Sequence, residues 1–224
     1  MRAMILAAGR GERMGELTAN IPKPLLRVGE HYLIEYAIFR VKQAGIQDIV
    51  INVSYRGDQI KLALGDGSRY GVNLLYSEEP HRLETGGGIF QALPLLGDEP
   101  FLVFSSDIIT DFPLASLRDQ LQGLAHLVMV NNPSYHGEGD YGLSNGLIGM
   151  SYQPKLTFAN MGVYHAALFN QCEPGHFRLT SVLNPAIMNN QVTGEQYSGM
   201  WFNVGTAEDL NEVNEYFKVN VVVD

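Results

Sequence analysis

The chain is poor in cysteine, in basic residues and in long apolar runs. Cys172 is the one cysteine among 224 residues, which excludes an internal disulfide framework and a cysteine-based zinc site. The 15 lysines and arginines stand against 24 acidic residues, and the formal net charge of -9 lacks the basic field that a general nucleic-acid binder needs. No apolar run approaches the roughly 20 residues of a membrane-spanning helix. We therefore expect a cytoplasmic protein without nucleic-acid or membrane partners.

Up to residue 104 the chain alternates strand-like and helix-like segments. Short apolar or β-branched runs predict strands at 4–7, 48–54, 72–77 and 101–104. Apolar residues at helical spacing predict helices at 32–44, 58–64 and 89–96, the last one after three glycines. This order is typical of an α/β protein whose parallel sheet is covered by helices on both faces. We predict a Rossmann-like, three-layer α/β/α fold with a mixed, mainly parallel sheet.

The second part of the chain has a different pattern. Longer strands are predicted at 125–131 and 156–166, with Gly and Asn turns between them, and a last amphipathic helix at 207–217. We expect this mixed region to lie over the first half. The sequence shows no repeat, low-complexity tract or long linker, which favours one domain over residues 1–224 with lobes at about 1–123 and about 124–224.

The segment that follows the first predicted strand is rich in glycine and carries three cations. Residues 6–25 read LAAGRGERMGELTANIPKPL and show neither a helical nor a strand period. Glycines allow the backbone to approach a ligand closely, and the cations suggest that this ligand is an anion. Pro22 and Pro24 restrict the backbone around Lys23, which favours a lysine aimed at a phosphate over one that is merely solvated.

Two known phosphate-binding motifs do not match this segment. The stretch from Gly9 to Met14 has methionine at the third glycine position of the dinucleotide fingerprint. The Walker form is also excluded, because no Gly-Lys-Ser/Thr follows. The glycines alone therefore leave a plain turn and a phosphate-binding loop equally open.

Asp107 follows the predicted strand at 101–104, as the glycine-rich segment follows the first strand. Ligands of parallel α/β sheets bind beyond the carboxyl ends of the strands, so we expect the two to lie on one edge of the sheet. Mg²⁺ is bound by one or two carboxylates together with substrate phosphates, and Asp107 is a candidate for the first of these. The alternative is an aspartate that caps the next element.

Several motifs together resemble the sugar-1-phosphate nucleotidylyltransferases. The similarity is to the bacterial N-acetylmuramate-1-phosphate uridylyltransferase branch, whose members are often labelled mannose-1-phosphate guanylyltransferases. It rests on residues throughout the chain: Leu6-Ala7-Ala8-Gly9-x-Gly11-x-Arg13-Met14, Pro22-Lys23-Pro24-Leu25, Glu84-Thr85-Gly86-Gly87-Gly88, Asp107, Gly139-Asp140-Tyr141-Gly142 and Trp201-Phe202-Asn203-Val204-Gly205-Thr206.

The resemblance implies an enzyme that transfers a nucleotidyl group from a nucleoside triphosphate to a sugar 1-phosphate and releases pyrophosphate. Its best match is UTP with N-acetylmuramic acid 1-phosphate in cell-wall (peptidoglycan) recycling. GTP with mannose 1-phosphate, and UTP or dTTP with glucose 1-phosphate, stay open. We expect a protein without the C-terminal β-helix extension of longer members, and we favour a monomer.

The resemblance also assigns roles to residues. Arg13, Lys23 and Asp107 are implied as catalytic residues, and Mg²⁺ as the cofactor. The implied nucleotide-binding residues are Ala8, Gly9, Gly11, Glu12, Arg13, Lys23, Thr85, Gly86, Gly87 and Ser105. Asp140, Asn160 and Gly162 are implied to face the sugar, and Asp107 and Asn203 to hold the metal.

The chain departs from the family pattern at two places. Asn203 stands where the family usually has aspartate, and Ser105-Ser106 where it commonly has Asn-Gly. A neutral amide oxygen can still coordinate magnesium but brings less charge, so we expect weaker metal binding. A nucleotide- or sugar-binding protein with weakened catalysis is therefore the alternative from another class. No motif supports His81 or His136, which lie in predicted loops near the site.

Overall fold

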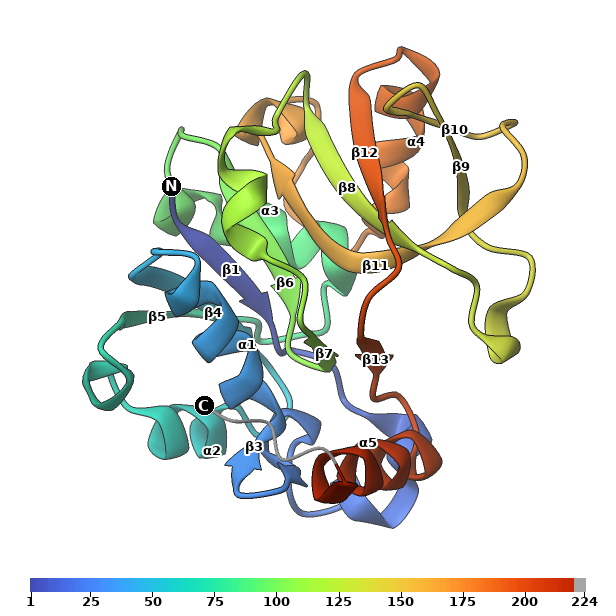
Figure 1. Cartoon of the computed structure of the whole chain (residues 1–224). Coiled ribbons are helices and arrows are strands. Elements are labelled where there is room, and N and C mark those ends of the chain that lie inside the picture. Colours follow the sequence, from blue (N-terminus) through green and yellow to red (C-terminus); the bar gives the residue numbers. More distant parts are fainter. Residues whose placement is uncertain (220–224) are drawn as a thin grey trace.

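A computed structural model describes residues 1–219 (Figure 1). A nine-stranded sheet runs in the order β5-β4-β1-β6-β11-β8-β12-β10-β9. Its strands are β1 (Ala3–Leu6), β4 (Asp48–Val53), β5 (Asn73–Glu78), β6 (Phe101–Ser105), β8 (Ala125–Val130), β9 (Tyr141–Ser144), β10 (Leu147–Gly149), β11 (Lys155–Tyr164) and β12 (Val192–Tyr197). The helices are α1 (Leu33–Gln43), α2 (Gly57–Leu64), α3 (Glu84–Leu96), α4 (Thr180–Met188) and α5 (Ala207–Val219).

The two halves of the chain form one continuous sheet. Strands β5, β4, β1 and β6 are parallel, and β11 then pairs antiparallel with β6, with Met161 opposite Phe104. Strand β8 pairs antiparallel with β11 and parallel with β12. The predicted mixed α/β sheet is confirmed. The expectation that the second half lies over the first was wrong, because β11 extends the sheet sideways through its ladder with β6.

Helices cover both faces of the sheet, as the alternation of elements predicts. On one face α1 and α2 pack against β1, β4 and β6 around Ile5, Ile38 and Ile51. On the other face α3 and α4 pack against the alternate residues of the same strands, around Met4, Ile89 and Val103. Strand residues buried on both faces explain why 101–104 is apolar without a break. Within residues 1–219, none of the helices has the length and apolar character needed to cross a membrane.

Helix α3 begins five residues before the predicted helix at 89–96. Its first five residues include the three glycines that we expected to precede it, and all three are buried. Helix propensity argues against glycine there, but packing requires it: a Cβ at Gly86 would lie 2.6 Å from the Phe177 ring and 2.8 Å from the backbone carbon of Arg178. The Gly87 N–H donates to the Phe177 carbonyl at 3.0 Å. The segment before α4 therefore packs directly on the start of α3.

The glycine-rich segment also contains short helical turns. A 3₁₀ helix runs over Glu12–Thr18 (η1) and another over Lys23–Leu25 (η2). Figure 1 shows α5, from the other end of the chain, beside this segment. The short strands β7 (Ile108–Thr110) and β13 (Trp201–Asn203) pair antiparallel and lead the chain back to it, while β2 (Arg27–Val28) pairs with β3 (His31–Tyr32). One buried cluster joins these parts: Met14, Leu26, Val28, Leu33, Ile109, Val204, Leu210 and Val213.

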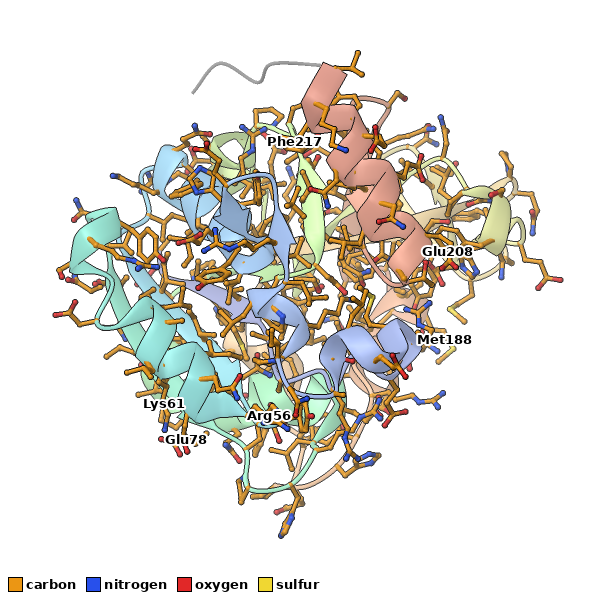
Figure 2. The ribbon with its side chains drawn as sticks, turned by 90° about the horizontal axis from the view of Figure 1, so that it is seen from below. Arg56, Lys61, Glu78, Met188, Glu208 and Phe217 are labelled. Atoms are coloured by element: carbon orange, nitrogen blue, oxygen red, sulfur yellow. The ribbon has the colours of Figure 1, made fainter. Side chains whose placement is uncertain are left out.

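At the outer edge of the sheet, Lys61 on α2 lies beside Glu78 at the end of β5 (Figure 2). The ammonium nitrogen is 2.9 Å from Oε1 of Glu78. The pair is on the surface, so it contributes little to stability. It marks the point where β5 ends, and the next residue, Glu79, turns inward to the site.

Candidate active site

Two cavities adjoin at the carboxyl ends of β1 and β6. The first, of about 350 Å³, is lined by residues 6–13, by Lys23 and by residues 105–107. The second, of about 430 Å³, lies toward β11 and α4. Both cavities are lined by Leu6, Glu84, Thr85 and Ser105, which therefore form a common wall. The expected position of the site at the carboxyl edge of the sheet is thus where the cavities are found.

The structure brings Lys23 and Asp107 together in the first cavity. The ammonium nitrogen of Lys23 is 2.5 Å from Oδ2 of Asp107, and Lys23 is buried. Gly11 has a φ of +67°, and a Cβ on it would lie 2.9 Å from Cβ of Lys23. Glycine at this position therefore permits both the left-handed turn and the close approach of the lysine. A fixed cation results, paired with a carboxylate at the end of β6.

Arg13 also reaches the first cavity, next to the end of β13. Its guanidinium nitrogen lies 2.9 Å from where a Cβ on Gly205 would be, so the absence of a side chain there makes room for it. Gly205 is held by its N–H, which donates to Oδ2 of Asp209 at 2.9 Å, in the first turn of α5. Ala8, Gly9, Glu12 and the shared residues Thr85 and Ser105 line the same cavity.

A buried acidic residue that the sequence analysis missed faces this cavity. Oε1 of Glu79 accepts a hydrogen bond from Asn52 at 2.7 Å, and its Oε2 accepts one from the Leu83 N–H at 3.2 Å. Asn52 in turn accepts from the Ala7 N–H at 2.9 Å, so the pair anchors the start of the glycine-rich segment. Burial raises the pKa of the Glu79 carboxyl. The sequence offered only position as a signal, since Glu79 directly follows β5 and Asn52 lies one residue before the end of β4.

Gly86 and Gly87 do not line either cavity. They are buried beneath residues 175–178, with the carbonyl of Gly175 only 2.2 Å from a Cβ placed on Gly87. The implied nucleotide contact of these two glycines stays a prediction, and the lining of the two cavities does not support it. Their role in the structure is to let a neighbouring segment approach α3.

The second cavity holds two of the three expected sugar-facing residues. Asp140 and Asn160 line it, whereas Gly162 lies within β11, where a Cβ would meet the His126 carbonyl at 2.5 Å. Gly162 therefore does not face the cavity, because close packing of β11 on β8 occupies that side. Oδ2 of Asp140 accepts from the Phe158 N–H at 2.8 Å, and Oδ1 lies 3.1 Å from His136. These contacts hold the Asp140 carboxylate in one orientation.

His136 lines the second cavity, whereas His81 lines neither. Tyr135, also in this cavity, has its pKa raised by burial, while a hydrogen bond with Asn203 opposes that rise. Neither Tyr135 nor the histidines belong to a motif, so the sequence offered only loop position as a signal.

Asn203 is held close to Asp107 by the β7–β13 ladder. Asn203 pairs with Ile108, and the Val204 N–H donates to the Asp107 carbonyl at 2.9 Å. Asp107 lines the first cavity and Asn203 the second. Within residues 1–219 no group of three or more His, Cys, Asp or Glu side chains is arranged to hold a metal ion. A metal here would have to draw its remaining ligands from elsewhere.

The family model described as nucleotidyl transferase matches residues 2–146 of the chain. The protein belongs to this family. Over 95% of its length this nucleotidyl transferase is 46% identical to the N-acetylmuramate alpha-1-phosphate uridylyltransferase of Neisseria meningitidis serogroup B, and the match covers 96% of that relative. It is 30% identical, over 93% of its length, to the mannose-1-phosphate guanyltransferase of Schizosaccharomyces pombe, of which it spans 62%.

Solved structures with low sequence identity share the fold of this nucleotidyl transferase. A Bacillus anthracis protein described as a glucose-1-phosphate thymidylyltransferase superposes with a TM-score of 0.85 at 21% identity, covering 96% of this chain and 94% of that one. A UDP-glucose pyrophosphorylase complexed with UDP-glucose gives 0.79 at 20% identity, with coverages of 98% and 99%. The two matches establish the architecture that the sequence analysis predicted.

Proposed function

We propose that this protein transfers a uridylyl group from UTP to N-acetylmuramate α-1-phosphate, in the cytoplasm, and that its product UDP-N-acetylmuramate serves peptidoglycan recycling. The observation that carries the proposal is the pair of cavities with a common wall at the sheet edge. A reaction that joins a nucleotide to a sugar phosphate needs two such compartments, with the reacting phosphates where they meet. The identity of 46% to the N. meningitidis protein supports the choice of substrates.

In this proposal the triphosphate occupies the first cavity and the sugar 1-phosphate the second. An oxygen of the sugar phosphate attacks the α-phosphorus, and the bond from that phosphorus to the pyrophosphate oxygen breaks. The attacking oxygen is already anionic, so no general base is needed, and catalysis rests on positioning and charge neutralisation. The backbone of Gly9–Gly11 cradles the phosphates, Arg13 stabilises the leaving pyrophosphate, and Lys23 stabilises charge at the α-phosphate.

The donor set fits a magnesium ion that is bound mainly through substrate. The carboxylate of Asp107 is a hard oxygen ligand at a strand end, and the β7–β13 ladder holds the amide of Asn203 near it. Mg²⁺ is commonly bound by one or two carboxylates together with substrate phosphates. When bound, the ion would neutralise phosphate charge, while Lys23 and Arg13 hold the phosphates in place.

The proposal assigns the nucleotide to residues of about 1–123 and the sugar to those of about 124–224, acting as a monomer. The division is not strict at the site itself. Gly205 lines the first cavity and Thr85 lines both, so each part contributes to the other's compartment.

The proposal is tested by measuring pyrophosphate release over a panel of triphosphates and sugar 1-phosphates. We expect the highest kcat/KM with UTP and N-acetylmuramate α-1-phosphate. A preference for GTP with mannose 1-phosphate, which the 30% identity to the S. pombe protein supports, would replace the substrates and keep the reaction. Absence of turnover with every pair would favour the alternative of a binding protein, which the neutral Asn203 supports.

A further inference from the structure

The second cavity carries one strong cation, Arg178. Among the described residues that line this cavity, it is the only arginine or lysine. The other charged side chains of the lining are Glu84 and Asp140, both acidic, and His136. The hydroxyl groups of a sugar need no guanidinium, so Arg178 points to an anionic group of the ligand.

Both carboxylates of the lining already have partners. Asp140 is held by the Phe158 N–H and by His136. Glu84 lies 2.9 Å from the guanidinium of Arg82 and 3.7 Å from His176. Arg178 is exposed to the cavity, and within residues 1–219 its side chain forms no ion pair or hydrogen bond. Its charge is therefore available to a ligand.

The backbone that carries Arg178 is fixed from both sides. The Phe177 N–H donates to the Leu83 carbonyl at 3.1 Å, and the Phe177 carbonyl accepts from Gly87. On its other side, the Arg178 carbonyl accepts from the Ser181 N–H at 3.0 Å as α4 begins. The missing side chain of Gly86 allows this close packing. The backbone of Arg178 is thus fixed in place. It lies beside the first turn of α4, whose helix dipole also favours an anion.

We propose that Arg178 binds a carboxylate on the sugar and makes the second cavity selective for acidic sugar 1-phosphates. The inference rests on the proposed function, and it names the group by which that substrate is recognised. N-acetylmuramate carries a carboxylate on its lactyl ether, whereas glucose, mannose and N-acetylglucosamine do not. The triphosphate has Arg13 and Lys23 in the first cavity, and the sugar phosphate reacts where the two cavities meet, so Arg178 is available within the second cavity to a further anionic group. A guanidinium matches a carboxylate in charge and in its paired donors.

The test compares N-acetylmuramate α-1-phosphate with N-acetylglucosamine α-1-phosphate, which differ by the lactyl group, at saturating UTP. We expect Arg178→Gln to lower kcat/KM for the acidic substrate by about ten- to a hundredfold, mainly through KM, because one partner of a charge pair is lost. For the neutral substrate kcat/KM should stay within about threefold, and Arg178→Lys should recover part of the loss. Lys218→Gln on the exposed surface of α5 removes the same charge far from the cavity and should change neither.

The possible outcomes separate the two proposals. If the wild-type protein turns over only neutral sugar phosphates, both are wrong. If it prefers the acidic substrate and Arg178→Gln keeps that preference, the role of Arg178 is wrong and the proposed function stands. An equal loss on both substrates, in a variant whose thermal unfolding is unchanged, would assign Arg178 to the common phosphate and also overturn the inference. If Arg178→Gln does not fold, Arg178→Lys is measured in its place. A selectivity and a KM for the acidic substrate that both equal those of the wild type would contradict a carboxylate held by the planar guanidinium.

Discussion

Lys23 and Asp107 are 84 positions apart in the chain, yet their side chains form an ion pair at the site. Such a pair does two things at once. It keeps the lysine in one place, and it offsets the cost of burying a carboxylate and an ammonium close together. The prolines on either side of Lys23 restrict the backbone, and Gly11 leaves space for its side chain. These residues therefore act mainly by holding the Lys23 ammonium in one position, as expected for a reaction without a general base.

We expect Lys23→Ala to lower kcat by about 10²–10³-fold, because removing one fixed donor to a developing charge typically has this effect. The KM for the triphosphate should change much less, since Arg13 and the glycine backbone still hold the phosphates. Steady-state kinetics with varied UTP separate the two parameters. An unchanged kcat would remove Lys23 from its role, and circular dichroism checks that the variant is folded.

The neutral side chain of Asn203 leads to a prediction about magnesium binding. Asn203→Asp places a second carboxylate close to Asp107 through the same β7–β13 ladder, so the magnesium concentration for half-maximal rate should fall about five- to thirtyfold, or about 1–2 kcal/mol. A titration of Mg²⁺ at saturating substrates measures it. Asn203→Ser is the matched control and should not lower that concentration. Superimposed curves for wild type and Asn203→Asp would show that residue 203 is not a metal ligand.

Among the elements, the start of α3 determines how the two cavities are joined. Its glycines are unfavourable for a helix by intrinsic propensity and necessary for packing against residues 175–178. The same turn supplies Glu84 and Thr85 to the common wall. The geometry of the wall thus depends on a contact between α3 and the segment that precedes α4.

Gly86→Ala tests this contact. The added Cβ would meet the Phe177 ring at 2.6 Å and the Arg178 backbone at 2.8 Å, and backbone cannot move aside as easily as a flexible side chain. Overpacking of this kind costs about 1–3 kcal/mol, which exceeds the roughly 1 kcal/mol that alanine gains over glycine in a helix. We expect a lower midpoint of thermal unfolding. The control is Gly137→Ala, where nothing lies within 4 Å of the new Cβ; equal midpoints for the two variants would contradict the argument.

His126 on β8 makes stability depend on pH. The side chain is buried, with Nδ1 2.8 Å from Oγ1 of Thr193, and burial lowers its pKa below the ordinary value of 6.5 although Glu195 opposes this. As the pH falls below 6.5, His126 takes up a proton in the unfolded chain at a pH where it is still neutral in the folded protein. The free energy of unfolding therefore falls with the pH, by at most about 1.4 kcal/mol per pH unit. The loss stops once the pH is below the folded-state pKa. Urea unfolding at pH of about 7.5 and 5.5 should show wild type losing stability relative to His126→Gln. A difference that does not change with pH would contradict the prediction.

The elements that the sequence predicted well are those with a local signal. The strands β1, β4 and β6 and the helix α1 follow from unbroken apolar runs or helical spacing, and Asp107 follows from its place after β6. The start of α3 could not be predicted in this way, because the reason for its glycines is Phe177, about ninety positions away in the chain. The extension of the sheet by β11 could not be predicted for the same reason, because the ladder between β11 and β6 joins residues far apart in the chain. Glu79 and Arg178 were missed because neither lies in a motif.

For the whole molecule, the negative net charge of -9 raises the question of how a triphosphate is attracted. The lining of the first cavity has no excess of cationic side chains over anionic ones. It contains Arg10, Arg13, Lys23 and Arg82, and also Glu12, Glu79, Glu84 and Asp107. Four formal positive charges therefore face four formal negative ones. The positive side chains can orient the phosphates, but the lining as a whole does not neutralise them.

We therefore expect binding of the triphosphate to require a divalent cation. Calorimetric titration of UTP should give an affinity at least about tenfold higher with excess MgCl₂ than with EDTA, a difference of about 1.4 kcal/mol. The same titration with UMP, which carries less charge, serves as the control and should depend much less on the cation. Equal affinity for UTP in both buffers would show that the protein's own cations suffice.

The contact between α5 and the glycine-rich segment has a consequence for biosynthesis. Met14, Leu26 and Val28 are covered by Leu210 and Val213, which the ribosome adds almost two hundred residues later. Until then these apolar side chains can pack only on one another and on Leu33 and Ile109, and the face that α5 covers stays open. A chain made from the N-terminus therefore completes its nucleotide compartment only after α5 has been made, and it carries an unprotected apolar surface until then. Such a nascent chain is a natural client for a chaperone that binds exposed apolar segments.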